Sequence, residues 1–170
     1  MPEKIPLLKP AFAKNGTITA ANSSKINDGA CTLVIMDEET ARERGLKPLA
    51  RILGYEDSAV APIDFGMAPS KACTKLIKKM GMTMKDVDYH EINEAFAAVP
   101  LANMKLMDLD PERINVFGGA VALGHPVGCS GARIILTLMN VLRNKNASVG
   151  MASICNGGGG ASAILIERLN

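Results

Sequence analysis

Three short segments of the sequence combine reactive side chains with residues typical of loops. They are residues 93–96 (Asn-Glu-Ala-Phe), His125 within a Gly-His-Pro sequence, and Cys155 ahead of four glycines at 157–160. Each follows a predicted strand, and functional sites in open α/β sheets collect at strand ends. Imidazole and thiol groups transfer protons near neutral pH, and unobstructed glycine N–H groups suit a pocket for developing negative charge.

Each segment also has a purely structural interpretation. Asn93 could cap a helix that begins there, and His125 could make a hydrogen bond that only holds its loop. Cys155 could be a small buried apolar residue, and the glycines after it could form a hairpin turn. Neither glycine-rich stretch has the G-x-G-x-x-G spacing, which disfavours a dinucleotide site.

From residue 48 onward the sequence alternates predicted strands and helices. The order is β-α-β-α-β-α-β-β, which predicts an α/β domain with a mixed sheet whose final hairpin adds an antiparallel strand. The expected strands are residues 49–55, 87–92, 115–117, 148–154 and 161–167, and the expected helices are residues 69–80, 93–108 and 130–143. Pro100 should kink the second helix or lie in its first turn.

Residues 1–47 have a different pattern and do not complete a domain. An extended opening leads to an apolar run at 31–36, predicted to be a buried strand, and then to a helix at 37–44 that ends at Gly45. A strand this apolar needs neighbours that the chain does not offer outside the second domain. We therefore divide the chain into residues 1–47, a strand-helix remnant of another domain, and residues 48–170.

The amino-acid composition disfavours several classes of function. Hydrophobic residues make up 48% of the 170 residues, net charge is +2, and no apolar run reaches the ~18 residues of a membrane span. Aromatic residues make up only 4%, which disfavours a nucleic-acid surface built on base stacking. Four cysteines without a C-x-x-C pair, and two histidines, disfavour a zinc site. We expect no metal, no nucleic acid and no membrane partner.

The three segments, in this order, resemble the thiolase family. The motifs are Asn-Glu-Ala-Phe, then Gly-His-Pro-x-Gly-x-Ser-Gly-Ala-Arg from Gly124, then Cys-x-Gly-Gly-Gly from Cys155, with supporting similarity at residues 16–22 and 27–30. The resemblance extends from about residue 10 to 169 and concerns the C-terminal part of thiolases. It is closest to the short-chain mitochondrial type that acts on acetoacetyl-CoA. Related condensing enzymes with two histidines fit less well, because the last reactive group here is Cys155.

The resemblance implies a role for each candidate residue. His125 would activate a nucleophilic cysteine and, with a water held by Asn93, would stabilise the thioester oxyanion. Cys155 would be the second acid/base, with a pKa lowered by its neighbours, and Gly157 would donate its N–H to the other oxyanion hole. Ser24 would lie near the pantetheine end of coenzyme A.

The resemblance also implies that this chain lacks the nucleophilic cysteine of thiolases. Thiolases are typically more than twice this length, and their nucleophilic cysteine lies in the first half. Cys31 matches a core strand, Cys73 matches a helix, and nothing indicates that Cys129 replaces the nucleophile. Phe117 and Lys25 depart from the residues usual at their positions.

We expect acetyl-CoA C-acetyltransferase activity, which converts 2 acetyl-CoA to acetoacetyl-CoA and CoA and catalyses the reverse thiolysis. Coenzyme A thioesters would be substrates, and no cofactor would be tightly bound. This chain would supply acid/base and oxyanion groups and be inactive alone, with an N-terminal thiolase half or a homo-oligomer as partner. The alternative is an inactive truncated paralogue that binds acyl-CoA or serves as an interaction module. The resemblance implies a mitochondrial location, with the cytoplasm as the alternative.

Overall fold

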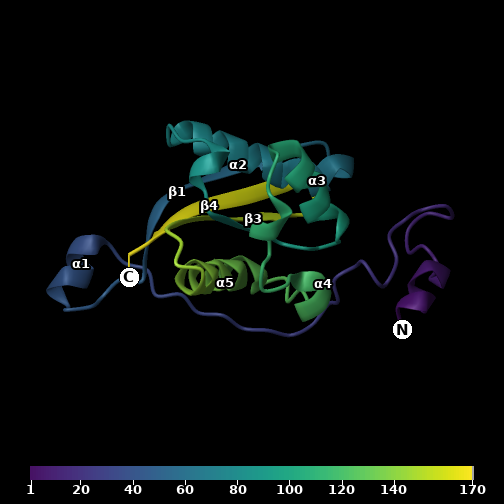
Figure 1. Cartoon of the computed structure of the whole chain (residues 1–170), viewed down its shortest axis with the longest axis horizontal. Coiled ribbons are helices and arrows are strands. Elements are labelled where there is room, and N and C mark those ends of the chain that lie inside the picture. The colour runs from purple at the N-terminus through teal and green to yellow at the C-terminus, as the bar shows by residue number, and fades with distance from the viewer. Residues whose placement is uncertain (170) are drawn as a thin grey trace.

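A four-stranded sheet lies between two layers of helices in the computed structural model, which describes residues 1–169 (Figure 1). Helices α2 and α3 cover one face of the sheet, and α5 with the short α4 covers the other. The strands are β1 (Ala50–Ala59), β2 (Tyr89–Ile92), β3 (Val149–Cys155) and β4 (Gly160–Arg168). The helices are α1 (Glu38–Glu43), α2 (Ala68–Lys79), α3 (Ala98–Met107), α4 (Ala120–Leu123) and α5 (Ser130–Asn144). Residue 170, the end of the predicted second domain, lies outside the described residues.

The sheet has the predicted mixed topology. Its order is β1-β4-β3-β2, with β2 parallel to β3 and with β4 antiparallel to both β3 and β1. The parallel pair is connected through helices, as such a crossover requires, and β3 and β4 form the expected terminal hairpin. The α/β prediction for the region from residue 48 is therefore confirmed.

Two apolar clusters, one on each face of the sheet, form the core. Successive strand residues face opposite sides, so Met151 joins the cluster under α2 whereas Ala152 joins the cluster over α5. Leu138 of α5 is fully buried against this second face. Gly150 permits the close approach, because a Cβ there would lie 2.6 Å from Cδ1 of Leu138.

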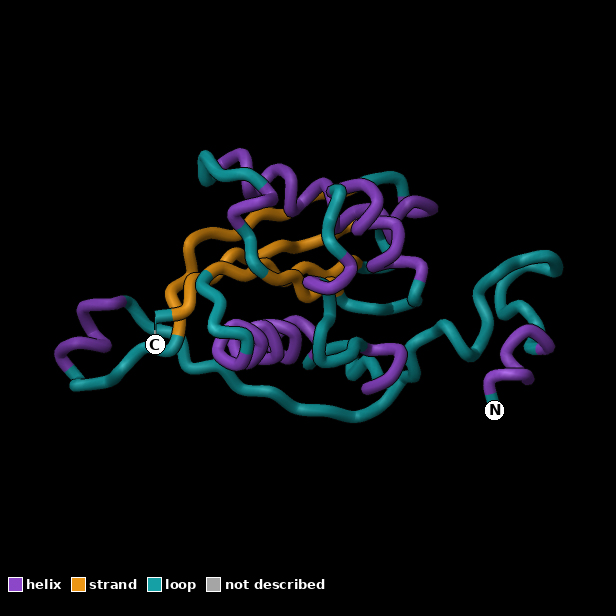
Figure 2. Tube along the Cα trace, viewed as in Figure 1, coloured by secondary structure: helices purple, strands orange, loops and turns teal. Residues whose placement is uncertain are grey.

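The predicted strand at residues 31–36 does not form. The segment is extended but has no strand partner in residues 1–169, and it exposes 83% of Val34 and 70% of Ile35. Figure 2 shows it as a loop that passes outside the α5 layer on its way to α1. A strand exists only with hydrogen-bonded neighbours, and the described part of the chain supplies none here. The helix after it is confirmed as α1, capped by Asp37 and followed by Gly45 with φ of +65°.

The predicted strand at residues 115–117 is also wrong. A single parallel bridge joins Ile114 to His90, and the chain then turns at Asn115, whose φ is +47°. The Asn115 side chain takes the place of the expected strand. Its Oδ1 accepts from the N–H of Ile92 at 2.8 Å, and its Nδ2 donates to the carbonyl of Ile92 at 2.9 Å.

The helix expected from residue 93 begins later, at Ala98. Residues 93–97 form a loop, because they bond to the N-terminal segment instead of to one another: the N–H of Ala97 donates to the carbonyl of Asn22 at 2.8 Å. Pro100 is the third residue of α3, in the first turn, where its missing N–H costs no intrahelical bond.

The described helices are short, and α5 has 15 residues. In residues 1–169 no helix is both long and apolar enough to cross a membrane. The same residues contain no group of three or more His, Cys, Asp or Glu side chains arranged to hold a metal ion.

Candidate active site

The C-terminal ends of β2 and β3 bring two of the predicted residues to one edge of the sheet. Asn93 directly follows β2, and its backbone N–H donates to the carbonyl of Ser153 in β3 at 2.9 Å. Cys155 ends β3 two residues further on. Parallel strands have their C-terminal ends at the same edge, so the expectation that the segments follow strands is met for these two, whereas the strand expected ahead of His125 does not form.

His125 reaches this edge from the loop between α4 and α5. Its backbone N–H donates to the carbonyl of Lys25 at 2.9 Å. Gly124 precedes it with φ of +96°, and any Cβ there would collide with the Asn27 side chain, so the turn requires glycine. The His125 ring lies between two partners: Nε2 is 3.1 Å from Nδ2 of Asn93, and Nδ1 is 2.7 Å from Oγ of Ser130.

The partners of Ser130 define the protonation of the His125 ring. The Ser130 hydroxyl donates its hydrogen to the carbonyl of Pro126 at 3.0 Å, so towards Nδ1 it can only accept. This arrangement matches a His125 tautomer with its proton on Nδ1 and a lone pair at Nε2 towards Nδ2 of Asn93. Burial, and then the positive charge of Arg133, lower the pKa of His125. The lowered pKa favours the neutral ring, which can accept a proton at Nε2.

Asn93 does not cap a helix, since α3 begins five residues later. It is 1% exposed, and its Oδ1 accepts from Nη2 of Arg133 at 3.1 Å. The structural interpretation is therefore wrong for Asn93, whose polar atoms serve the cluster around His125. Ser130 and Arg133 were not singled out as site residues, although both belong to the Ser-Gly-Ala-Arg part of the quoted motif.

Cys155 lies in an apolar environment. It is 9% exposed and belongs to the core cluster under α2, opposite Ala161 of β4. Burial raises the pKa of the Cys155 thiol, which corrects the expectation that neighbours lower it. The reason is that its described neighbours are apolar and include no cation that favours a thiolate. Among residues 1–169, no hydrogen bond connects Cys155 to His125.

The glycines after Cys155 close the β3–β4 hairpin. The N–H of Asn156 donates to the carbonyl of Gly160 at 2.9 Å, and Oδ1 of Asn156 accepts from the N–H groups of Gly158 and Gly160 at 3.1 and 3.2 Å. Gly157 is exposed, and its N–H has no partner among the described residues. The turn interpretation is correct for most of the segment and leaves Gly157 as a free donor.

Ser24 lies against the loop that carries Asn93. Its N–H and its hydroxyl both donate to the carbonyl of Ala95, at 3.0 and 2.9 Å, and a bridge joins Ser23 to Phe96. The segment before residue 47 therefore holds the site loop in place. Because the hydroxyl hydrogen is used, Ser24 can act on a ligand only as an acceptor.

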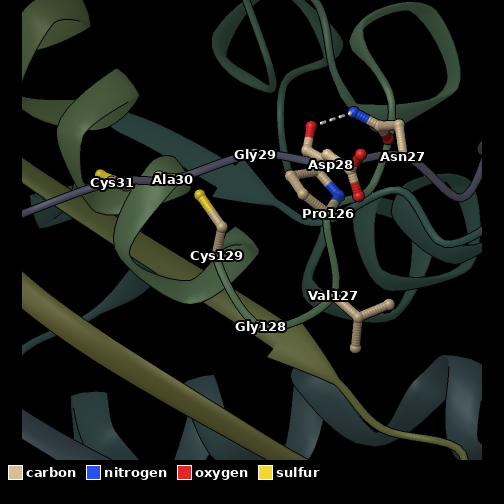
Figure 3. Close-up of a pocket in the computed structure, with 9 residues that line it drawn as sticks. All are labelled: Asn27, Asp28, Gly29, Ala30, Cys31, Pro126, Val127, Gly128 and Cys129. Carbon is tan, nitrogen blue, oxygen red and sulfur yellow. Dashed lines mark hydrogen bonds between the residues drawn. The ribbon is translucent and has the colours of Figure 1, made fainter.

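Two cavities adjoin these residues. One of about 310 Å³ lies between the segment 27–31 and the loop 126–129 that follows His125 (Figure 3). Cys129 lines it, with its sulfur directed towards the segment that contains Gly29 and Cys31. The second, of about 510 Å³, is largely apolar, and Phe12, Phe65, Phe96 and Val99 are among its lining residues. The rings of Phe12 and Phe65 meet Phe96 edge-on.

The described motifs match two family models. The model of the thiolase C-terminal domain matches residues 46–168, and that of the thiolase N-terminal domain matches residues 1–39. This chain belongs to the thiolase family.

Individual thiolases are similar to this chain over nearly all of its length. A probable acetyl-CoA acetyltransferase of Dictyostelium discoideum is 58% identical over 167 residues, which are 98% of this chain and 40% of that protein. The mitochondrial acetyl-CoA acetyltransferase of Rattus norvegicus is 54% identical over 98% of this chain and 39% of its own length. A thiolase from Ascaris suum, solved in complex with coenzyme A, superposes with a TM-score of 0.91 at 50% identity, covering 99% of this chain and 44% of that one. The chain thus spans about two fifths of each thiolase.

Proposed function

We propose that this chain is the part of a thiolase-type acetyl-CoA C-acetyltransferase that supplies acid/base and oxyanion groups. The reaction is the reversible conversion of 2 acetyl-CoA to acetoacetyl-CoA and CoA. The observation that carries the proposal is the 3.1 Å contact of Nδ2 of Asn93 with Nε2 of His125, in a member of the thiolase family. We divide the chain at residues 47 and 48, with the first part as a thiolase N-terminal remnant that supports the site.

His125 is the base in this proposal. Its lowered pKa keeps Nε2 free to take the proton of a cysteine thiol, which makes the sulfur a nucleophile. That cysteine would come from an N-terminal thiolase segment, on the same or on another polypeptide. When the thioester carbonyl is attacked, the protonated ring and a water held by the Asn93 amide would stabilise the oxyanion.

Cys155 is the second acid/base. Its raised pKa suits a thiol that rests protonated, as the thiolysis direction requires. There the nucleophile attacks the ketone carbon of acetoacetyl-CoA, the carbon–carbon bond breaks, and Cys155 gives its proton to the acetyl-CoA enolate. The free N–H of Gly157 would hold the enolate oxygen. CoA then gives its thiol proton to the Cys155 thiolate and takes the acetyl group, and the departing sulfur of the nucleophile recovers its proton from His125.

Coenzyme A thioesters are the proposed substrates, with no tightly bound cofactor. The apolar cavity beside Phe96 suits the uncharged end of such a substrate, and the acceptor oxygen of Ser24 suits a pantetheine amide N–H. The same features support the second candidate, an inactive paralogue that binds acyl-CoA. Mitochondrial location is proposed from the rat relative, with the cytoplasm as the alternative, and imaging of a fluorescent fusion decides between them.

Reconstitution tests this function. The full chain is mixed with an N-terminal thiolase segment that carries the nucleophilic cysteine, and thiolysis of acetoacetyl-CoA is followed by loss of enolate absorbance. We expect turnover that His125→Ala and Cys155→Ala abolish while circular dichroism stays unchanged, with Cys129→Ala as an active control. Tight acyl-CoA binding without turnover in the correctly folded mixture would favour the inactive paralogue.

A further inference from the structure

Arg133 is a half-buried cation next to the candidate site, and the proposed reaction does not use it directly. From the first turn of α5 it donates through Nη2 to Oδ1 of Asn93. Its Nε and Nη1 are buried without a hydrogen-bond partner among residues 1–169, and so is Oε1 of Glu91 on β2. Burying charged groups costs several kcal/mol each, so a guanidinium in this place needs a reason.

The hydrogen bonds from Arg133 onward form a directional series. They run from Arg133 to Asn93, from Asn93 to His125, from His125 to Ser130, and from Ser130 to the carbonyl of Pro126. A guanidinium can only donate, and a carbonyl can only accept. Because both ends are fixed, every hydrogen between them has one possible position.

We propose that Arg133 is a positioning residue that locks the Asn93 amide and, through it, keeps Nε2 of His125 unprotonated. Because Nη2 of Arg133 donates to Oδ1 of Asn93, Nδ2 of Asn93 must face the imidazole ring of His125. The catalytic consequence rests on the proposed function, but the effect on the ring does not.

Without Arg133 the amide could rotate by half a turn. Oδ1 would then face His125 and stabilise a proton on Nε2, while Ser130 would turn its hydroxyl towards Nδ1 and lose its bond to Pro126. The charged group that acts on the ring is Arg133 on α5. Arg133 also acts on Glu91 of β2: burial and the charge of Glu94 raise the pKa of Glu91, whereas Arg133 lowers it. Loss of Arg133 would therefore change the position of a proton at the base itself.

The test is nitrogen-15 NMR of the two histidine rings in the full chain above pH 7, assigned with a His125→Gln variant. In the wild type and in Arg133→Lys, we expect His125 to be protonated on Nδ1. In Arg133→Met we expect a mixture of tautomers or protonation on Nε2. The exposed Arg143 on the same helix provides the control, Arg143→Met, with no change expected. A wild-type ring protonated on Nε2, or an Arg133→Met ring still protonated only on Nδ1, overturns the proposal.

Asn93→Asp provides a second variant that keeps the shape of the side chain. Two acceptor oxygens should draw a proton onto Nε2, and an unchanged neutral ring with its proton on Nδ1 would contradict the proposed lock. In the reconstituted enzyme, Arg133→Met should lower kcat about 10²-fold with a change in KM of roughly threefold or less, and Arg133→Lys should restore part of the rate. If NMR gives the expected His125 tautomers but the reconstituted enzyme has no turnover, the result counts against the proposed function alone. The NMR measurement of the His125 ring does not depend on activity.

Discussion

Nδ2 of Asn93 lies 3.1 Å from Nε2 of His125, although 32 residues separate them in the chain. The contact depends on the end of β2, on the turn at Gly124, and on the backbone bond from His125 to Lys25. The N-terminal segment therefore takes part in aligning the base. A substitution that disturbs any of these three features should change the contact between Asn93 and His125.

Acid should destabilise the chain through His90. Burial, and then the charge of Arg113, lower the pKa of His90 to about 4 from 6.5, so its contribution to stability is complete above pH 6.5 and lost as pH falls through about 4. We expect a loss of about 3 kcal/mol across this window. Urea unfolding of wild type and His90→Gln between pH 7.5 and 4 measures it. His90→Gln should flatten the dependence, and an unchanged slope would contradict the assignment.

A rise in pH, rather than a fall, should destabilise the chain through Glu91, the residue after His90. Burial raises its pKa to about 8 from 4.5, so its contribution is complete below pH 4.5 and lost as pH rises through about 8. Glu91→Gln should gain stability relative to wild type between pH 5 and pH 9, by an amount on the order of a few kcal/mol. Thermal unfolding at the two pH values provides the measurement, with the exposed Glu112→Gln as the matched control. Equal responses of the two variants would refute the prediction.

The four cysteines should react with iodoacetamide at different rates. Burial raises the pKa of Cys73 to about 11 and also raises that of Cys155, and both thiols are shielded from solvent. Cys31 and Cys129 are half-buried. At pH 7.5 we expect these two to be alkylated first and Cys73 last, as peptide mass spectrometry can follow. Labelling of Cys155 as fast as Cys129 would mean that Cys155 is not enclosed.

Gly150 should be intolerant of a side chain. A Cβ there would lie within 3.1 Å of three carbons of Leu138, so Gly150→Ala should lower the unfolding free energy by about 1–3 kcal/mol. Chemical denaturation measures the loss. Gly128→Ala, where a Cβ meets open space, is the control, and similar stability of both variants would show that α5 can move away from the sheet.

Much of the fold was predictable because its signals are local. The signals for the helices expected at residues 69–80 and 130–143, and for the helix end at Gly45, lie within single segments, and the structure confirms these elements as α2, α5 and the end of α1. The failures share a physical cause. Residues 31–36 find no strand partner among residues 1–169, and the side chain of Asn115 replaces a strand with two bonds to a residue 23 positions away.

The candidate site was predictable in part. Asn93 and His125 meet as the motifs indicate, and the motif residues Ser130 and Arg133 gain their importance only from contacts across the fold. The direction of the Cys155 pKa was wrong, because the burial of one thiol depends on both sheet and helix packing.

The central claim is that His125 activates a cysteine that residues 1–169 do not contain. Its most direct test is to mix the full chain with an N-terminal thiolase segment and acetyl-CoA, quench with acid, and locate the acetyl thioester by peptide mass spectrometry. We predict acetylation on the cysteine of the added segment, at a rate that falls about 10²-fold with His125→Ala. Acetyl on Cys129 or Cys155 of this chain, or a rate that His125→Ala leaves unchanged, would contradict the account.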